Sequence, residues 1–409
     1  MQNGKKWLGP GEKTYEYLVD INNKGADELI KIRNDINKSR GDGHHRNERT
    51  WGAQQAAEMI GRSPQWLRDT DPDVPKNAAG HGRWTLGRII GLMEQAGTLY
   101  KRPKGSRALI TAMAKFKGGV GNTTNTLHLA HGLAMKGLRV LIWDWDAQAS
   151  ATQGGGGKVP DLELDDEDLP LDIMANNPKG ILDPNCKVVM GTYFHNVDLI
   201  PANSALNELE LTLITQFLGS EDSTSEIRPE HRMAAVLAYI KEHYDVILID
   251  CPPTLGMNSM NGLLAADGVI TSLKPELLDR ASLVAFTDAL AGMCSNYGKT
   301  YEYFRILISQ YQDGITTDPT SGTVGGSVHR RNELALRQLY GEAVMESMMY
   351  HSREIGSAAT EMSTVLANEK PVGSRAAYKR AVSVVNDVVN EVYNDLVTIW
   401  ESEADDDGE

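Results

Sequence analysis

The chain has 409 residues, of which 41% are hydrophobic and 23% charged, an ordinary globular composition with enough length for two or three domains. It has no run of eighteen apolar residues and no apolar amino-terminal segment, so we expect a soluble, cytoplasmic protein without a membrane span or signal peptide. Cys186, Cys251 and Cys294 are far apart and lack CxxC spacing. This argues against a disulfide framework and a zinc site.

The net charge of −14 is unevenly distributed along the chain. Residues 1–107 carry 19 Lys and Arg against 13 Asp and Glu, whereas the remainder carries 22 against 42. A basic first part on an acidic body suggests that nucleic acid contacts the first part. A well-solvated surface explains the same charge equally well, so charge alone leaves both readings open.

The first predicted element is a helix over residues 15–40, within an amino-terminal segment that we assign to residues 1–45. Its apolar positions have helical spacing and are Leu18, Ile21, Leu29, Ile32 and Ile36. Gly25 leaves open whether there is one helix or two. Residues 41–50 are polar and contain glycine, which is typical of a linker.

Residues 46–107 are predicted to form a second unit that ends in the basic connector 101–107. The pattern gives a short helix over residues 53–60, a turn at Gly61 and a second helix capped by Ser63. Residues 81–84 resemble the wing of MerR-like domains, and a helix capped by Thr85 is expected to follow. A helix-turn-helix places its second helix in the major groove. A helical protein-contact domain remains the alternative, and the residues expected to face DNA are Arg62, Gln65, Arg68 and Arg83.

From Ala108 onward, apolar runs alternate with helical stretches. This predicts an α/β domain over residues 108–400, with a twisted, mainly parallel sheet and helices on both faces. Residues 154–170 are rich in glycine and acid, so we expect a flexible insertion. A turn at Pro371 precedes an amphipathic helix. Residues 401–409 are too acidic and too poor in apolar residues to fold, and we expect a disordered tail.

The strongest signal is a glycine-rich loop between an apolar strand and a helix. The loop turns backbone N–H groups toward anionic oxygens, and the helix N-terminus adds its dipole. Thr123 stands where a hydroxyl can bind Mg²⁺. A lone glycine-rich loop can also be a plain tight turn. The expected nucleotide-binding residues here are Lys117, Gly118, Gly119, Val120, Gly121, Asn122, Thr123 and Thr124.

Three aspartates follow at predicted strand ends. Asp144 and Asp146 lie in VLIWDWDAQAS, and Asp250 ends the apolar run of YDVILIDCPPTLG. A carboxylate at the carboxyl edge of a parallel strand is well placed to hold Mg²⁺ through water. We therefore expect Thr123 and Asp250 near the metal.

The run KGGVG resembles the deviant Walker A box of the ParA/MinD family of P-loop ATPases. The DxDxQ box at 144–148, the strand ending in Asp250 and the proline-containing segment around Pro275 resemble further boxes of that family. The resemblance implies ATP or ADP and Mg²⁺ as ligands. It also implies that Lys117 reaches the phosphates of the partner subunit, that Asp144 lies near the metal, that Asp146 orients the attacking water, and that Pro275 lies near the base.

One position departs from the family pattern, KGG-x-G-K-[TS], because Asn122 stands where the phosphate-binding lysine is expected. A neutral amide can donate a hydrogen bond but supplies no positive charge. We therefore expect impaired hydrolysis, unless another cation such as Lys117 or Lys115 takes its place. The alternative is a degenerate or trapped nucleotide-binding and DNA-binding scaffold without ATP turnover.

The resemblance extends to the longer, autoregulating ParA-type partition ATPases, whose winged helix precedes the ATPase domain and whose earlier helix supports dimerisation. It implies ATP-dependent partition of a plasmid or phage genome by a nucleoid-associated homodimer. It further implies specific DNA binding by the amino-terminal domain, repression of its own operon, non-specific DNA binding by the ATPase domain with Arg353 as the preferred contact, and a ParB-like centromere-binding partner. A MinD-like membrane ATPase is disfavoured by the acidic end, and a nitrogenase-iron-protein-like reductase by the missing cluster cysteines.

Overall fold

The computed structural model describes residues 12–40, 47–115, 117–219, 227–312, 316–317, 324–325 and 328–406. Its centre is a seven-stranded sheet in the order β5-β6-β4-β7-β3-β8-β9, in which only the short edge strand β5 is antiparallel to its neighbour. The expected mainly parallel sheet is confirmed. The strands are β3 (Leu109–Ala114), β4 (Val140–Asp144), β5 (Met190–Gly191), β6 (Val197–Ile200), β7 (Val246–Asp250), β8 (Gly268–Leu273) and β9 (Tyr303–Ile308).

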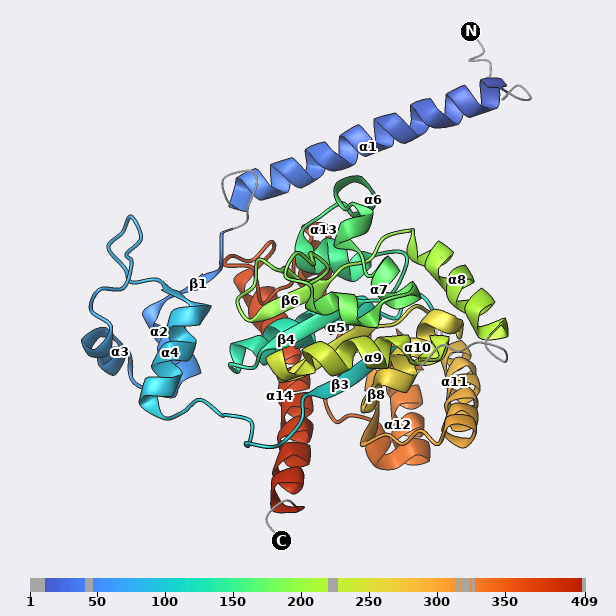
Figure 1. Ribbon diagram of the computed structural model, residues 1–409. Helices are drawn as coiled ribbons and strands as arrows, with labels where there is room; N and C mark the ends of the chain where they lie inside the picture. The colour runs from blue at the N-terminus through green and yellow to red at the C-terminus, as the bar shows by residue number, and fades with distance from the viewer. Residues whose placement is uncertain are drawn as a thin grey trace.

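Helices cover both faces of this sheet (Figure 1). Alternate residues of each central strand enter different cores: Val140 and Ile142 of β4 pack with α5 (Asn122–Met135) and α14 (Arg375–Asp406), whereas Leu141 and Trp143 face the opposite core. Strands buried on both faces explain the nearly continuous apolar runs in the sequence. The opposite layer is formed by α7 (Leu171–Ala175), α8 (Leu206–Leu218), α9 (Arg232–Ile240), α10 (Met257–Ala265) and α11 (Leu277–Tyr297).

The helices α5 and α14 approach each other closely. A Cβ atom at Gly132 would lie 2.3 Å from Cγ2 of Val389, so glycine is needed for this approach. The buried side of α14 consists of Ala381, Val385, Val388, Val389, Val392, Leu396 and Trp400. The helix α12 (Val328–Tyr340) packs against the β9 edge, and α13 (Arg353–Thr360) precedes the loop that leads into α14.

The amino-terminal unit contains α2 (Ala53–Ile60), α3 (Pro64–Thr70) and α4 (Leu86–Ala96), with an antiparallel pair of β1 (Thr50–Trp51) and β2 (Trp84–Thr85). Ser63 Oγ accepts a hydrogen bond from the Trp66 amide at 3.1 Å and caps α3. Thr85 caps α4 in the same way. Gly61 ends α2 at φ 72°. The local sequence signals therefore predicted these helices and their ends correctly.

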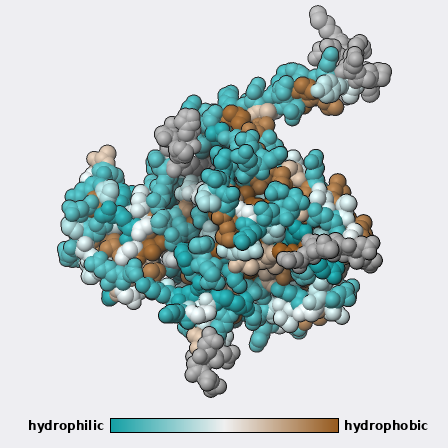
Figure 2. Space-filling model, in the orientation of Figure 1, coloured by the Kyte–Doolittle hydropathy of each residue, from teal (hydrophilic) through white to brown (hydrophobic). Residues whose placement is uncertain are grey.

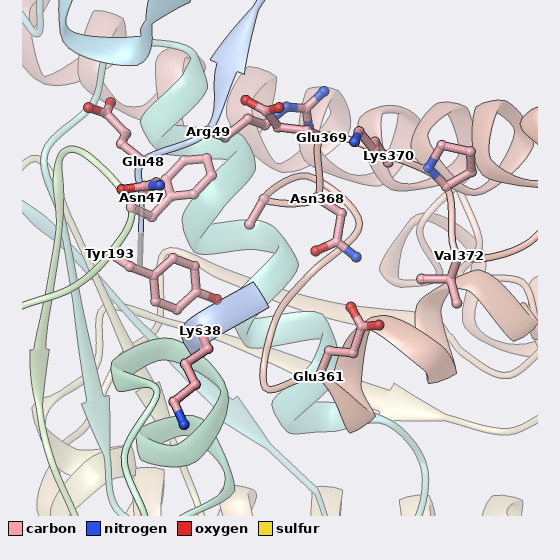
Figure 3. A pocket seen from close by; sticks show the side chains of 13 residues that line it. Lys38, Asn47, Glu48, Arg49, Tyr193, Glu361, Asn368, Glu369, Lys370 and Val372 are labelled. Carbon is pink, nitrogen blue, oxygen red and sulfur yellow. The ribbon is translucent and has the colours of Figure 1, made fainter. Parts of the chain in front are cut away.

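This unit docks on the α/β domain through the segment 366–369. Glu369 Oε1 accepts hydrogen bonds from the amide and hydroxyl of Thr50 at 3.0 and 2.6 Å, and lies 3.1 Å from the Arg83 guanidinium. Arg49, whose side chain stacks on Trp51, donates to the carbonyl of Leu366. Beside this contact lies a polar cavity of about 550 Å³, lined by Lys38, residues 47–49 and the 361–372 loop (Figure 3).

The helix α1 (Glu12–Arg40) is a single helix of 29 residues without a break at Gly25. It lies across the top of the molecule, and Arg33 pairs with Glu163 of α6 (Pro160–Glu163) (Figure 1). Apolar side chains are exposed along it, visible as brown patches in Figure 2. They include Tyr15, Leu18, Ile21, Leu29 and Ile32.

Two expectations from composition differ from the structure. The insertion at 154–170 forms short helical turns, in which Val159, Pro160 and Leu169 are buried. The acidic end is not disordered through residues 401–406, because α14 continues to Asp406 and Glu403 pairs with Arg107 of the basic connector at 2.9 Å. Residues 407–409 and most of the expected linker, 41–46, lie outside the described residues.

The remaining short strands, β10 (Thr316–Thr317) and β11 (Val324–Gly325), form an antiparallel pair of their own. Among the helices of the described ranges, none combines the length and the apolar character required to cross a bilayer.

Candidate nucleotide-binding site

The glycine-rich loop joins β3 to α5 and leaves the helix N-terminus open. Gly119 and Gly121 adopt φ values of 75° and 85°, in the left-handed region that favours glycine. A Cβ atom at Gly121 would approach the side chains of Ser309 and Gln310 at 3.2 and 3.1 Å. Asn125, one turn into α5, donates to the hydroxyls of Ser272 and Ser309. The loop is thus fixed between β3 and the ends of β8 and β9.

A cavity of about 470 Å³ opens above this loop. Its lining includes many of the predicted nucleotide-binding residues, together with Asp146. A side chain at Gly118 or Gly119 would face open space, so the backbone there is accessible to a ligand. The predicted residues that the structure brings together at this cavity are Gly118, Gly119, Gly121, Asn122, Thr123 and Thr124.

Asp250 lies beneath the cavity, at the carboxyl end of β7, and accepts hydrogen bonds from the first turns of α5. Its Oδ2 accepts from the Thr123 hydroxyl at 2.6 Å, and its Oδ1 accepts from the Thr126 hydroxyl at 3.2 Å. Burial raises the pKa of Asp250, although the nearby Lys115 ammonium and the hydroxyl donors oppose this shift. A hydroxyl beside a carboxylate at a helix N-terminus is a hard-oxygen donor set, so these two residues fit Mg²⁺.

Asp144 lies beside Asp250 because β4 and β7 are parallel and these two residues pair in register. Burial, followed by the charge of Asp250, raises the pKa of Asp144 to about 7. Its Oδ2 accepts from the amide and hydroxyl of Thr152 at 2.7 and 2.8 Å. Asp144 does not line the cavity, so in this conformation it holds the following turn.

Asn122 is 2% exposed and its amide points below the loop. Its nitrogen donates to the Met113 carbonyl at 2.8 Å and to Asp250 Oδ1 at 3.0 Å. A side-chain amide has two N–H donors, and both are engaged here. In this conformation the Asn122 side chain therefore has no N–H left for a phosphate.

Three further predicted residues lie away from the cavity. Lys117 donates to its own chain's Asp279 near the start of α11, and this hydrogen bond raises the pKa of Lys117. Pro275 is buried, and its carbonyl accepts from Asn332 at 2.8 Å. Val120 is buried beside the same small pocket as Lys117.

Sequence reasoning missed a wall of the cavity that comes from far along the chain. Ser363 and Thr364 line it opposite the loop, together with His128 of α5. His128 Nδ1 lies 2.7 Å from the Thr124 carbonyl, and its Nε2 accepts from the Val365 amide. Burial lowers the pKa of His128 to about 4, so the ring is neutral at pH 7. No local motif marks these residues, because the contact spans more than two hundred positions.

The predicted DNA-facing residues separate into two groups. Arg62, Gln65 and Arg68 are exposed on and before α3, where Arg68 bonds to Gln65 at 2.9 Å. Arg83 is half-buried and bonds to Thr50 and Glu369, so it faces the domain contact. Arg353 is exposed at the first turn of α13. Further exposed cations of the α/β domain are Arg330, Arg331, Arg375, Lys379 and Arg380.

Comparison with known proteins agrees with this geometry. Residues 108–296 match the family model described as AAA domain. A putative replication protein A of Rhizobium rhizogenes is 28% identical over 86% of this chain and 88% of its own length. The protein SopA of Escherichia coli (strain K12) is also 28% identical, over 85% and 89%.

Two solved structures share the fold. A structure described as a partition protein matches with a TM-score of 0.61 and 17% identity, over 93% of this chain and 97% of its own. A putative plasmid partition protein of Borrelia burgdorferi B31, bound to AMPPNP, matches with a TM-score of 0.50 and 21% identity, over 70% and 99%. By sequence this chain is similar to SopA and to the AAA family model, and by fold it shares the P-loop architecture of the solved partition proteins.

Proposed function

We propose that this protein is an ATP-dependent DNA-partition ATPase acting on a plasmid or phage genome. The observation that carries the proposal is the open glycine loop above the Thr123–Asp250 pair, at the carboxyl edge of a parallel sheet. The names of the relatives support it, since they include SopA and a plasmid partition protein bound to an ATP analogue. Nucleoid association follows from the proposed binding of bulk DNA.

ATP or ADP would occupy the cavity, with its phosphates against Gly118, Gly119 and the N-terminus of α5. Thr123 and Asp250 would hold Mg²⁺, which supplies positive charge to the phosphates. Asp146 lines the same cavity and would accept a hydrogen bond from the attacking water. Asp144 would support this arrangement by fixing the turn at Thr152.

The active form would be a homodimer closed around nucleotide. Lys117 would leave Asp279 and reach the partner subunit's phosphates, and the exposed apolar side chains of α1 would provide a second contact between subunits. The unit over residues 46–107 would act as a winged helix-turn-helix that reads a specific site through Arg62, Gln65 and Arg68 and represses its own operon. Arg353 would contact bulk DNA, and a ParB-like partner would trigger release.

One observation favours a second function, a nucleotide-binding and DNA-binding scaffold that does not turn over ATP. Both side-chain donors of Asn122 are engaged below the loop, so the side chain of residue 122 has no N–H left for a phosphate. Loss of one preorganised donor typically costs a factor on the order of 10²–10³ in rate. Hydrolysis would be impaired to this extent if no other cation takes the place of the missing lysine.

A phosphate-release assay on the full chain separates the two functions. With ATP, Mg²⁺, DNA and the ParB-like partner present, an ATPase releases phosphate continuously, whereas a scaffold binds ATP and releases none. Comparison with the Asn122→Lys variant shows by what factor asparagine at position 122 lowers the rate of phosphate release. Light scattering with ATP tests closure of the dimer, which we expect Lys117→Ala to weaken without unfolding the chain. A chain that binds no nucleotide would refute both functions.

A further inference from the structure

A lysine that belongs to no recognised box of the loop lies inside the nucleotide cavity. Lys115 follows β3 directly, and its side chain is 9% exposed. Its Nζ lies 3.2 Å from Asp146 Oδ2, and the residue lines the same cavity as Gly118, Gly119 and Thr123. The strand end therefore directs a buried ammonium group toward the place where the loop would hold phosphates.

The two other candidates for a phosphate-binding side chain already bond to other residues. Asn122 uses both of its donors on Met113 and Asp250. Lys117 is paired with Asp279 and lines a different pocket. Among the described lining residues of the nucleotide cavity, Lys115 is the one Lys or Arg.

The surroundings keep this lysine charged. Burial alone would lower the pKa of Lys115, but the carboxylates of Asp250, Asp146 and Asp144 outweigh burial and raise it. Asn122 bonds to Asp250 but is neutral. The cation that faces these three carboxylates is therefore Lys115, which approaches them from the end of β3. A lysine at position 122 would approach the same acids from the helix side.

We propose that Lys115 is the phosphate-binding lysine of this protein and replaces the lysine missing at position 122. This inference rests on the proposed nucleotide-binding function. When the phosphates of ATP enter, the Lys115 ammonium transfers from Asp146 to the β- and γ-phosphate oxygens. Asp146 is then released from its ion pair and is available to accept a hydrogen bond from water. The residue at 122 keeps a different task, which is to hold Asp250 in position.

Calorimetric titration of the full chain with ATPγS, ADP and AMP, each with Mg²⁺, tests the proposal. Lys115→Met keeps the length of the side chain and removes its charge. We expect affinity for ATPγS and ADP to fall by about ten- to a hundredfold, the usual effect of losing a charge-assisted hydrogen bond. AMP, which lacks the β- and γ-phosphates, should be affected less. The matched control is Lys101→Met, an exposed lysine outside the cavity, and it should bind all three as before.

A reciprocal exchange makes the test independent of the stability of the single variant. Lys115→Asn combined with Asn122→Lys keeps one lysine and one amide beside Asp250, and should recover ATPγS affinity to within a few fold. Lys115→Asn alone should not. Unchanged ATPγS binding by folded Lys115→Met, or an exchange variant no better than Lys115→Asn, overturns the proposal while the proposed function stands. Absence of nucleotide binding by the unaltered chain overturns both.

Discussion

Removal of the Glu369 carboxylate should loosen the amino-terminal unit from the ATPase domain. The carboxylate accepts two hydrogen bonds from Thr50 and pairs with Arg83. Bonds to a charged acceptor contribute about 1.5–3 kcal/mol when buried, but this side chain is 40% exposed and surface pairs contribute about 1 kcal/mol or less. We therefore expect Glu369→Ala to weaken docking by about 2 kcal/mol, a roughly thirtyfold rise in the undocked population.

Hydrogen exchange of the full chain, followed by mass spectrometry, measures this change. Amides of β1 and β2 should exchange faster in Glu369→Ala than in the unaltered protein, and Glu58→Ala, an exposed acid on α2, serves as the control. The contact should also weaken at acidic pH. Burial opposes ionisation of Glu369, but Thr50 and Arg83 outweigh it and lower the pKa. Its stabilising effect is thus present above the usual pKa of Glu and is lost as pH falls through the lowered value.

The same experiment tests whether nucleotide binding changes hydrogen exchange in the amino-terminal unit. Ser363 and Thr364 line the nucleotide cavity, and Glu369 follows a few residues later at the domain contact. ATPγS should therefore alter exchange at Thr50 in the unaltered protein and much less in Glu369→Ala. Identical exchange of β1 and β2 in the two proteins, with and without nucleotide, would refute this reasoning.

Three other changes have defined outcomes. Burial raises the pKa of Asp144 to about 7, so the unfolding free energy of the unaltered protein should fall as pH rises from about 4 to 8. Urea titrations of Asp144→Asn should show a weaker dependence of the unfolding free energy on pH, and an equal dependence in the two proteins would contradict the raised pKa. Gly132→Ala should lower the unfolding free energy by about 1–3 kcal/mol through overpacking, and a second change, Val389→Ala, should recover part of it; full stability of the single variant would count against the close approach. Arg68→Ala should weaken binding of DNA from its own promoter region by about tenfold, measured by fluorescence anisotropy, and random DNA less; equal losses would argue against specific reading.

Local signals in the sequence predicted most of the architecture. Apolar runs ending in Asp144 and Asp250 located two central strands, and the hydroxyls of Ser63 and Thr85 located two helix starts, because capping depends on residues within one turn. Composition was a poorer guide for residues 401–406, where the contact between Glu403 and Arg107 joins positions almost three hundred apart.

The candidate site was predicted in outline and missed in its detail. The loop glycines and Thr123 follow a contiguous motif, so their convergence was foreseeable. The Asn122 amide points toward two acceptors, the Met113 carbonyl of β3 and the Asp250 carboxylate of β7. Lys115 reaches Asp146 because the end of β3 lies close to that residue in the folded sheet. Sequence could name Lys115 as a candidate cation, but only the packed strands distinguish it from Lys117.

The closing helix has a consequence for the order in which the molecule is assembled. The chain is synthesised from its amino-terminal end, so α14 leaves the ribosome after all the other described elements. Until then the outer side of α5 has no cover, and Arg107 lacks both the indole of Trp400, which donates to its carbonyl at 3.0 Å, and the carboxylate of Glu403. The segment 366–369, to which the first unit docks, is also made late. The amino-terminal unit therefore cannot dock on the α/β domain until residues 366–369 have been synthesised, more than three hundred positions after Arg49 and Thr50.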